Sequence, residues 1–342
     1  MRALLYALAR QQFDADDRRR AEDLCANTAV DWPSLLKTAA AEGVAPIVGV
    51  NLAECDPPIT RVPPAVTLRF QQALFENAAL KASRRDEFAG QVADLDARGY
   101  DILLLKSMAL EATGVYTEPW VTAARDVDIG LRRRTPVCNA ADDSRFRQTL
   151  NESGIETEHP TGHHDLSLGG VIPLHVDEWW RGARPVSLDG VPGPLFTLSA
   201  EDALFVLCLN ACRKGFFRLK GLFDIRETIV RDEGIDWTRF AARVARSSAG
   251  GVAYTALRAA AMTVGLPDPA LPQRLALVSR PRAAALDAAM ALASRVGVRS
   301  RVIGAALQCA SLSPSQRWRN LTTPQWSARS AAEIAASSLP GE

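Results

Sequence analysis

The chain has 342 residues, 47% of them hydrophobic, and its 40 basic and 39 acidic side chains leave a formal net charge of +1. This length exceeds a typical single core, so two or three substructures are expected, and the near-neutral charge argues against nucleic acid as a partner. The scattered cysteines, the lack of an apolar run of ~18 residues and the lack of a signal-peptide pattern predict a cytoplasmic protein with free thiols and no membrane partner. Nothing in the sequence predicts an oligomeric state.

Residues 1–95 predict an N-terminal helical region. Asp31 precedes the segment WPSLLKTAAAEG, so we expect it to cap a helix that Gly43 ends. Prolines then mark a loop at Pro57–Pro64. Apolar residues at helical spacing predict a long helix from about Val66 to Arg98.

Residues 96–190 predict a small α/β core. Tyr100–Leu105 (YDILLL) is a short apolar run that favours a buried strand, and a helix is expected after Lys106-Ser107. The remaining predicted elements are a strand at 126–131, a charged helix at 136–153, and strands at 156–158, 164–168 and 171–179. Gly169-Gly170 is typical of a hairpin turn between the last two.

Residues 191–342 predict a C-terminal helical region, joined to the core by a proline- and glycine-rich link at Pro185–Pro194. Ser199 and Asp236 each precede a helical pattern and are expected to be helix caps. The tail from about Ser311 is rich in Ser, Ala and Arg, which favours partial looseness. The predicted fold class is therefore α+β, with a small mixed sheet flanked by N- and C-terminal helical regions.

Two carboxylates in the second predicted strand carry the strongest chemical signal. Alternation places Val127, Ile129 and Leu131 on one face and Asp126 and Asp128 on the other. Two carboxylates on one face cannot both be buried without a partner. Mg²⁺ takes oxygen ligands and is often held by one or two carboxylates together with substrate phosphates. The pair predicts a Mg²⁺ (or Mn²⁺) site of the kind used in nucleotidyl transfer.

The order of motifs along the chain resembles a known family. A strand is followed by Lys106-Ser107, a helix, a tyrosine, Asp126-Val127-Asp128, a strand that contains His175, and a helical segment that includes LCLNA and RLKGLFDI. This set resembles the uncharacterised bacterial nucleotidyltransferases of the DNA polymerase β-like superfamily, over nearly the whole chain. The resemblance implies a polymerase β-like core that transfers a nucleoside monophosphate from an NTP to an acceptor hydroxyl and releases pyrophosphate.

Lys106 and Ser107 are the predicted contacts to the triphosphate. Ser107 lies at the start of a predicted helix, where backbone N–H groups and the helix dipole favour a phosphate, and it also suits a helix cap. Lys106 either meets a phosphate oxygen as a point charge or pairs with an acidic neighbour. The resemblance places an arginine where this chain has Thr122, and Arg125 is expected to take over part of its role.

The resemblance also implies a third carboxylate, on a neighbouring strand, that activates the acceptor hydroxyl. In the predicted strand 171–179, Pro173, His175 and Asp177 share one face. Asp177 is the candidate third carboxylate and metal ligand, and His175 is the group that orients it or handles a proton. Pro173 occupies the position where the resemblance places an acidic residue.

Two other functions fit the sequence. A nucleotidyltransferase fold without catalysis would bind a nucleotide or a partner, and Pro173 favours this alternative. A metal hydrolase would use the segment 163–177, where the side chains that suit zinc or another transition metal are His163, His164, Asp165, His175 and Asp177. Neither the base of the NTP nor the acceptor, which is a small molecule, a peptide or a protein, can be named from the sequence.

Overall fold

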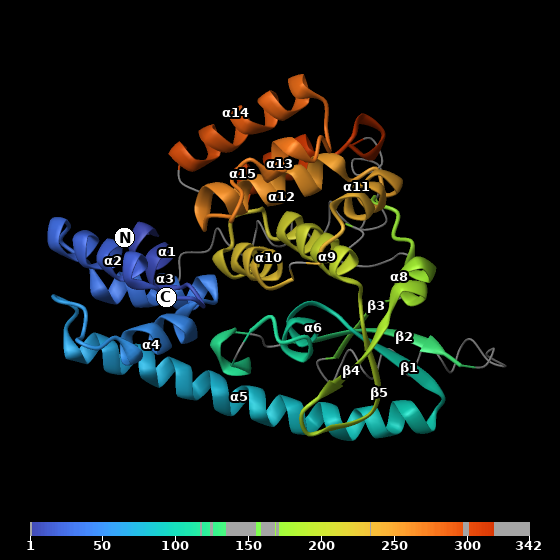
Figure 1. The fold of residues 1–342 in the computed structure, drawn as a ribbon, viewed down its shortest axis with the longest axis horizontal. Coiled ribbons are helices and arrows are strands. Elements are labelled where there is room, and N and C mark those ends of the chain that lie inside the picture. The colour runs from blue at the N-terminus through green and yellow to red at the C-terminus, as the bar shows by residue number, and fades with distance from the viewer. Residues whose placement is uncertain are drawn as a thin grey trace. The chain divides into compact units, whose positions relative to one another are not determined.

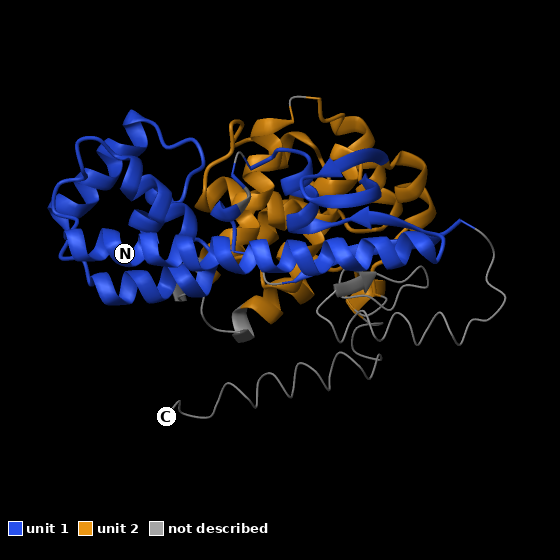
Figure 2. Cartoon of the chain, turned by 90° about the horizontal axis from the view of Figure 1, so that it is seen from below, with its two compact units in different colours: residues 1–157, 184–197 blue, residues 158–183, 198–342 orange. Residues whose placement is uncertain are grey.

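The computed structural model describes residues 2–116, 118–123, 126–134, 155–158, 168, 171–232, 234–296 and 301–317. The chain divides into two compact units (Figure 2). Unit 1 comprises Met1–Thr157 and Arg184–Thr197, and unit 2 comprises Glu158–Ala183 and Leu198–Glu342. The three-region division expected from the sequence stays a prediction.

Unit 1 begins with helices whose ends follow local sequence signals. The Asp31 side chain accepts a hydrogen bond from the Ser34 amide (3.1 Å), and Gly43 ends the same helix in the left-handed conformation with φ of 74°. Both predicted helix ends are confirmed. The helices are α1 (Arg2–Leu8), α2 (Ala15–Asn27), α3 (Trp32–Glu42), α4 (Ala45–Glu54) and α5 (Pro64–Ala97). With 34 residues, α5 spans about 51 Å.

A five-stranded mixed sheet follows in unit 1 (Figure 1). Its strands have the spatial order β3-β2-β1-β5-β4 and are β1 (Tyr100–Leu104), β2 (Val127–Arg133), β3 (Ile155–Glu158), β4 (Arg184–Leu188) and β5 (Val191–Thr197). β1 pairs antiparallel with β2 and parallel with β5, and β5 pairs antiparallel with β4. The predicted first three strands are confirmed with small shifts at their ends, and so is the α+β class with a mixed sheet.

The core of unit 1 lies between the sheet and α5, which runs along it (Figure 1). Val127, Ile129 and Leu131 alternate along β2 and are all buried in this core, which confirms the predicted alternation. Partners from β1 and α5 in the same cluster are Ile102, Leu104, Phe88, Val92 and Leu95. Each buried aliphatic side chain contributes about 1.5–3 kcal/mol, so this face fixes the register of β2 and leaves Asp128 on the opposite face.

The predicted link at Pro185–Pro194 is wrong, because this segment forms the β4–β5 hairpin. β4 lies at the edge of the sheet and, among the described strands, pairs only with β5. A proline is tolerated there because no second strand requires its missing N–H. Within β5 only Leu195–Thr197 pair with β1, so Pro192 and Pro194 lie before that ladder begins. The prolines are typical of a loop but occupy positions where their missing N–H costs no pairing with β1.

The predicted strand at 171–179 is also wrong. Residues 173–175 have no regular structure, and α8 spans Val176–Gly182. Trp179 and Trp180 are both buried, which differs from the simple alternation of a strand with one solvent-exposed face. Asp177 in the first turn is favourable with the helix dipole. The predicted helix at 136–153, and the strand and turn at 164–170 apart from Leu168, lie outside the described residues.

The regular elements that follow α8 in the described part of unit 2 and lie outside the β4–β5 hairpin are helices. They are α9 (Ala200–Arg213), α10 (Leu219–Arg231), α11 (Trp237–Arg246), α12 (Gly250–Thr263), α13 (Leu271–Arg274), α14 (Arg280–Val296) and α15 (Arg301–Ser311). Ser199 accepts a hydrogen bond from the Asp202 amide at the start of α9, and Asp236 accepts one from the Arg239 amide at the start of α11, which confirms both caps. None of the helices in the described ranges is long and apolar enough to cross a membrane.

Candidate functional site

The turn between β1 and α6 (Lys106–Ala112) brings the candidate phosphate contacts to β2. The Leu105 amide donates a hydrogen bond to the carbonyl oxygen of Asp128 (3.0 Å), which continues the β1–β2 pairing by one residue. Lys106 follows with φ of 49°, in the left-handed region that non-glycine residues seldom adopt. Such a conformation costs about 1–3 kcal/mol and persists only where its surroundings hold it.

Lys106 and Asp128 form a buried ion pair that supplies this hold. Lys106 Nζ donates to Asp128 Oδ1 over 2.5 Å, and the two side chains are only 6% and 11% exposed. Of the two alternatives that the sequence left for Lys106, the structure shows the pairing with an acidic neighbour. Loss of one partner would leave a buried charge uncompensated, at a cost of about 3–5 kcal/mol.

Asp126 differs from Asp128 in its surroundings. It lies directly before β2 and is exposed, whereas Asp128 is buried within the strand. The two candidate metal ligands are therefore near each other along the backbone, with one carboxylate open to solvent and the other held by Lys106. An exposed carboxylate can exchange water for a metal ion without breaking a contact inside the protein.

Asp126 also lines a small pocket, with a cavity volume of about 20 Å³, between α5, α6 and the start of β2. Among the described residues, its polar lining comprises Lys81, Arg84 and Arg85 from α5, Glu111 from α6, and Asp126 itself. Met108 of α6 adds an apolar wall. We call this site the α5 basic pocket. All of these residues belong to unit 1.

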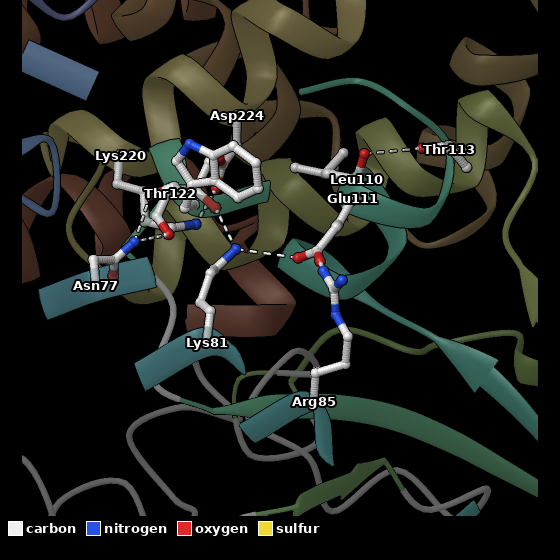
Figure 3. Close-up of polar contacts among 10 residues, drawn as sticks. Asn77, Lys81, Arg85, Leu110, Glu111, Thr113, Thr122, Lys220 and Asp224 are labelled. Carbon is white, nitrogen blue, oxygen red and sulfur yellow. Dashed lines mark hydrogen bonds and ion pairs between the residues drawn. The ribbon is translucent and has the colours of Figure 1, made fainter. Parts of the chain in front are cut away.

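Glu111 is the centre of the ion pairs in the α5 basic pocket (Figure 3). Lys81 Nζ lies 3.1 Å from Glu111 Oε2, and Arg85 pairs with the other carboxylate oxygen. Lys81 also donates to the Thr122 hydroxyl over 3.0 Å. Asn77, one helical turn before Lys81, donates to the carbonyl oxygen of Thr122 (3.2 Å). Glu111 is 9% exposed, so this network ties α6 and the segment before β2 to α5.

Sequence reasoning missed this cluster. Its signal is the spacing of Lys81, Arg84 and Arg85, which places three cations on neighbouring positions of a predicted helix. That spacing is also typical of a solvated helix face. What gives it meaning is the contact with Glu111, 26 and 30 residues away along the chain, which no local pattern predicts.

Ser107 and Arg125 have different outcomes. Ser107 is the second residue of α6 and half-buried, but the cap residue is Leu105, so Ser107 is not the helix cap. Its contact to a triphosphate stays a prediction. Arg125 lies outside the described residues.

Asp177 and His175 belong to unit 2. Asp177 is exposed in the first turn of α8, and His175 is the residue that precedes this helix, without a capping bond from its side chain. Asp177 is therefore presented by a helix rather than by a strand beside β2, where the sequence had predicted it. Its role as third carboxylate stays a prediction.

The donor set at β2 suits a hard divalent cation. Asp126 and Asp128 offer only oxygen ligands, and Mg²⁺ is commonly held by one or two carboxylates with water and substrate phosphates in the remaining positions. In the described ranges no three His, Cys, Asp or Glu residues gather as a closed metal site. Of the residues predicted for a zinc hydrolase, His175 and Asp177 are described, whereas His163, His164 and Asp165 lie outside the described residues.

The comparisons with known proteins give one finding. A family model described as an uncharacterised nucleotidyltransferase matches residues 28–265. This range covers helices α3 to α12, with a small part of the next loop, and includes the whole sheet, the Lys106–Asp128 pair and the α5 basic pocket. No curated protein and no solved structure matches the chain.

Proposed function

Because the chain belongs to this family of uncharacterised nucleotidyltransferases, we propose that it transfers a nucleoside monophosphate from an NTP to a hydroxyl group of a small molecule, a peptide or a protein. The O–P bond between the α- and β-phosphates breaks, the acceptor oxygen forms the new bond to the α-phosphorus, and pyrophosphate leaves. The observation that carries the proposal is the pair Asp126 and Asp128 at the start of β2, beside Lys106 on the strained turn after β1.

Asp126 and Asp128 are the residues that would hold Mg²⁺ or Mn²⁺. The bound metal would neutralise charge on the phosphate oxygens. Asp126 contributes an exposed carboxylate, and Asp128 contributes a carboxylate whose position is fixed by Lys106 and by its place in the sheet. A ligand set that is rigid on one side and open on the other can receive the metal together with its substrate.

Lys106 and Ser107 are proposed to position the triphosphate, with Arg125 as a further contact. The lysine ammonium has three N–H donors, and one is directed at Asp128. Its charge is therefore placed beside the carboxylate pair, where phosphate oxygens need a cation. Phosphoryl-type transfer depends mainly on positioning and charge stabilisation, so these few groups suffice.

Asp177 is proposed to accept the proton of the acceptor hydroxyl. His175, two residues earlier in the chain, is proposed to orient the Asp177 carboxylate. Its exposure on α8 leaves the carboxylate accessible to a substrate. Asp177→Asn should lower the rate of transfer and leave NTP binding unchanged, which separates a base from a ligand of the donor.

The first experiment measures thermal unfolding with each NTP, with and without Mg²⁺. A ligand at about 100 times its Kd stabilises the folded state by about 2.7 kcal/mol, which gives a clear shift of Tm. We expect a Mg²⁺-dependent shift for at least one NTP and its loss in Asp126→Asn. Because Asp126 is exposed, this variant should fold normally, whereas Asp128→Asn also disturbs the buried pair.

Asp189→Asn is the matched control, because Asp189 is an exposed aspartate in the turn between β4 and β5 of the same unit. It should keep the full shift. A Mg²⁺-dependent shift that survives in both Asp126→Asn and Asp128→Asn would contradict the proposed site.

The second candidate function is nucleotide binding without catalysis. The observation that favours it is the closed Lys106–Asp128 pair, which already compensates one of the two carboxylates. Binding of an NTP with Mg²⁺, without pyrophosphate release in the presence of a broad set of hydroxyl acceptors, would support this alternative over transfer.

A further inference from the structure

The α5 basic pocket has a role that the assignments above do not use. Asp126 lines the pocket and is a proposed metal ligand. The three cations of the pocket, however, lie on α5, outside the segment that contains Lys106, Ser107 and Arg125. The charges in the pocket wall indicate which kind of group the pocket can hold.

The arrangement of charge suits an exchangeable anion. Among the described lining residues Lys81, Arg84 and Arg85 are cations and Glu111 and Asp126 are carboxylates, while Glu87, the carboxylate that pairs with Arg84, lies outside the lining. Glu111 engages Lys81 and Arg85 and so fixes the ends of both side chains. Fixed cations lose little conformational freedom when an anion arrives, which strengthens binding.

Arg84 is the cation of the pocket that Glu111 does not engage in the ion pairs described above. Its Nη1 lies 2.8 Å from Glu87 Oε2, and both side chains are exposed, at 39% and 53%. An exposed pair of this kind contributes little to stability and exchanges easily with another anion. A guanidinium group can also bind phosphate with two parallel hydrogen bonds.

We propose that the α5 basic pocket is an anion subsite that binds a phosphate group of the substrate, with Arg84 as its exchangeable contact and Lys81 and Arg85 as its fixed cations. This inference rests on the proposed function for the identity of the substrate, and on the pocket alone for the binding of phosphate. The phosphate belongs either to the polyphosphate tail of the donor or to a phosphorylated acceptor.

The test is calorimetric titration of the full chain with inorganic tripolyphosphate, at low salt and without divalent ions. Arg84→Ala should weaken binding about tenfold, equivalent to about 1.4 kcal/mol, and should leave the Tm of the free protein unchanged. The control is Arg69→Ala, which removes the same charge from an exposed position of α5, 15 residues before Arg84 and so about 22 Å away along the helix. This variant should bind tripolyphosphate as the wild type does.

Three results would overturn the subsite: no binding of tripolyphosphate to the wild type, equal affinity in all three proteins, or an equal loss in both arginine variants. The last would mean that tripolyphosphate senses only the overall charge of α5. Because the titration contains no metal, its outcome does not depend on the binding of Mg²⁺ by Asp126 and Asp128. The titration can therefore support the subsite even if the proposed function is contradicted. It can likewise contradict the subsite while the proposed function is supported.

A second pair of titrations distinguishes the two sources of the phosphate. If the subsite holds the donor tail, Arg84→Ala should weaken the binding of the preferred NTP by the same factor as tripolyphosphate. If it holds an acceptor, the NTP affinity should stay constant while the binding of glycerol phosphate, a simple phosphomonoester, weakens. A variant that weakens neither ligand would contradict the proposal.

Discussion

Two ion pairs of this protein are similarly buried but differ in the residues and backbone that surround them. In unit 1, Lys106 pairs with Asp128 at the turn after β1. In unit 2, Arg243 of α11 pairs with Asp202 of α9 over 2.6 Å, with side chains that are 6% and 0% exposed. Burial and pairing are thus the same in both places and do not by themselves mark a functional site.

The surroundings separate the two pairs. Asp202 also accepts a hydrogen bond from the Ser199 hydroxyl (3.1 Å), and Arg243 also pairs with Glu178 of α8, so this network joins three helices. The Lys106–Asp128 pair instead has a left-handed backbone at Lys106 and, two residues from Asp128, the exposed Asp126 at an open pocket. We therefore propose a functional role for the Lys106–Asp128 pair and a structural role for the Arg243–Asp202 pair, which joins three helices.

The largest expected effect comes from removing the cation from each of the two pairs. Lys106→Met and Arg243→Met each leave a buried aspartate without its partner and should each lower the free energy of unfolding by about 3–5 kcal/mol. Only Lys106→Met should also abolish the Mg²⁺-dependent binding of NTP, measured by calorimetry at a temperature where both variants are folded. Loss of NTP binding in Arg243→Met, or its retention in Lys106→Met, would reverse the assignment of the two pairs.

The sequence predicted the strand β2 better than the segment around α8, and the reason lies in the range of the interactions. The caps at Asp31, Ser199 and Asp236 depend on residues within one helical turn, so their patterns are local. The alternation along β2 is likewise visible in the chain, because one face is apolar and the other carries Asp126 and Asp128.

The features that the sequence did not predict depend on tertiary contacts. Pro192 and Pro194 read as a loop because their tolerance in β5 depends on where the pairing with β1 begins. The segment before Trp179 alternates as a strand would, but the structure forms helix α8 there and buries both tryptophans. Glu111 has no signal of its own, because its partners Lys81 and Arg85 lie on another helix.

A smaller change tests the structural side of the comparison. Ser199→Ala removes both the cap of α9 and the hydrogen bond to Asp202, and should lower the free energy of unfolding by about 1 kcal/mol. NTP binding should not change, because the residue belongs to the enclosed network. Urea unfolding and calorimetry measure the two effects. A loss well above about 2 kcal/mol, the upper end for a cap, would mean that the Ser199 hydroxyl also holds the Arg243–Asp202 pair together.

The smallest expected effect concerns Asp101, a third paired carboxylate, which lies on β1 opposite Arg132. Burial raises the pKa of Asp101, but hydrogen bonds from Arg132 and Arg134 outweigh it and hold the pKa below its usual value of 3.8. A folded-state pKa below the unfolded one stabilises the protein above the unfolded pKa, and this contribution disappears as the pH falls through the folded pKa.

Asp101→Asn should therefore be less stable than the wild type near neutral pH, and the difference should shrink as the pH falls through the folded pKa. Both arginines are more than a third exposed, so solvent screens the interaction and the difference should stay below about 1 kcal/mol. Urea unfolding at about pH 7 and about pH 3 measures it. A difference of several kcal/mol at neutral pH would show that the solvent-screened pairs of Asp101 stabilise the fold as much as the buried Lys106–Asp128 pair does. Burial would then not explain which paired carboxylates contribute most to stability.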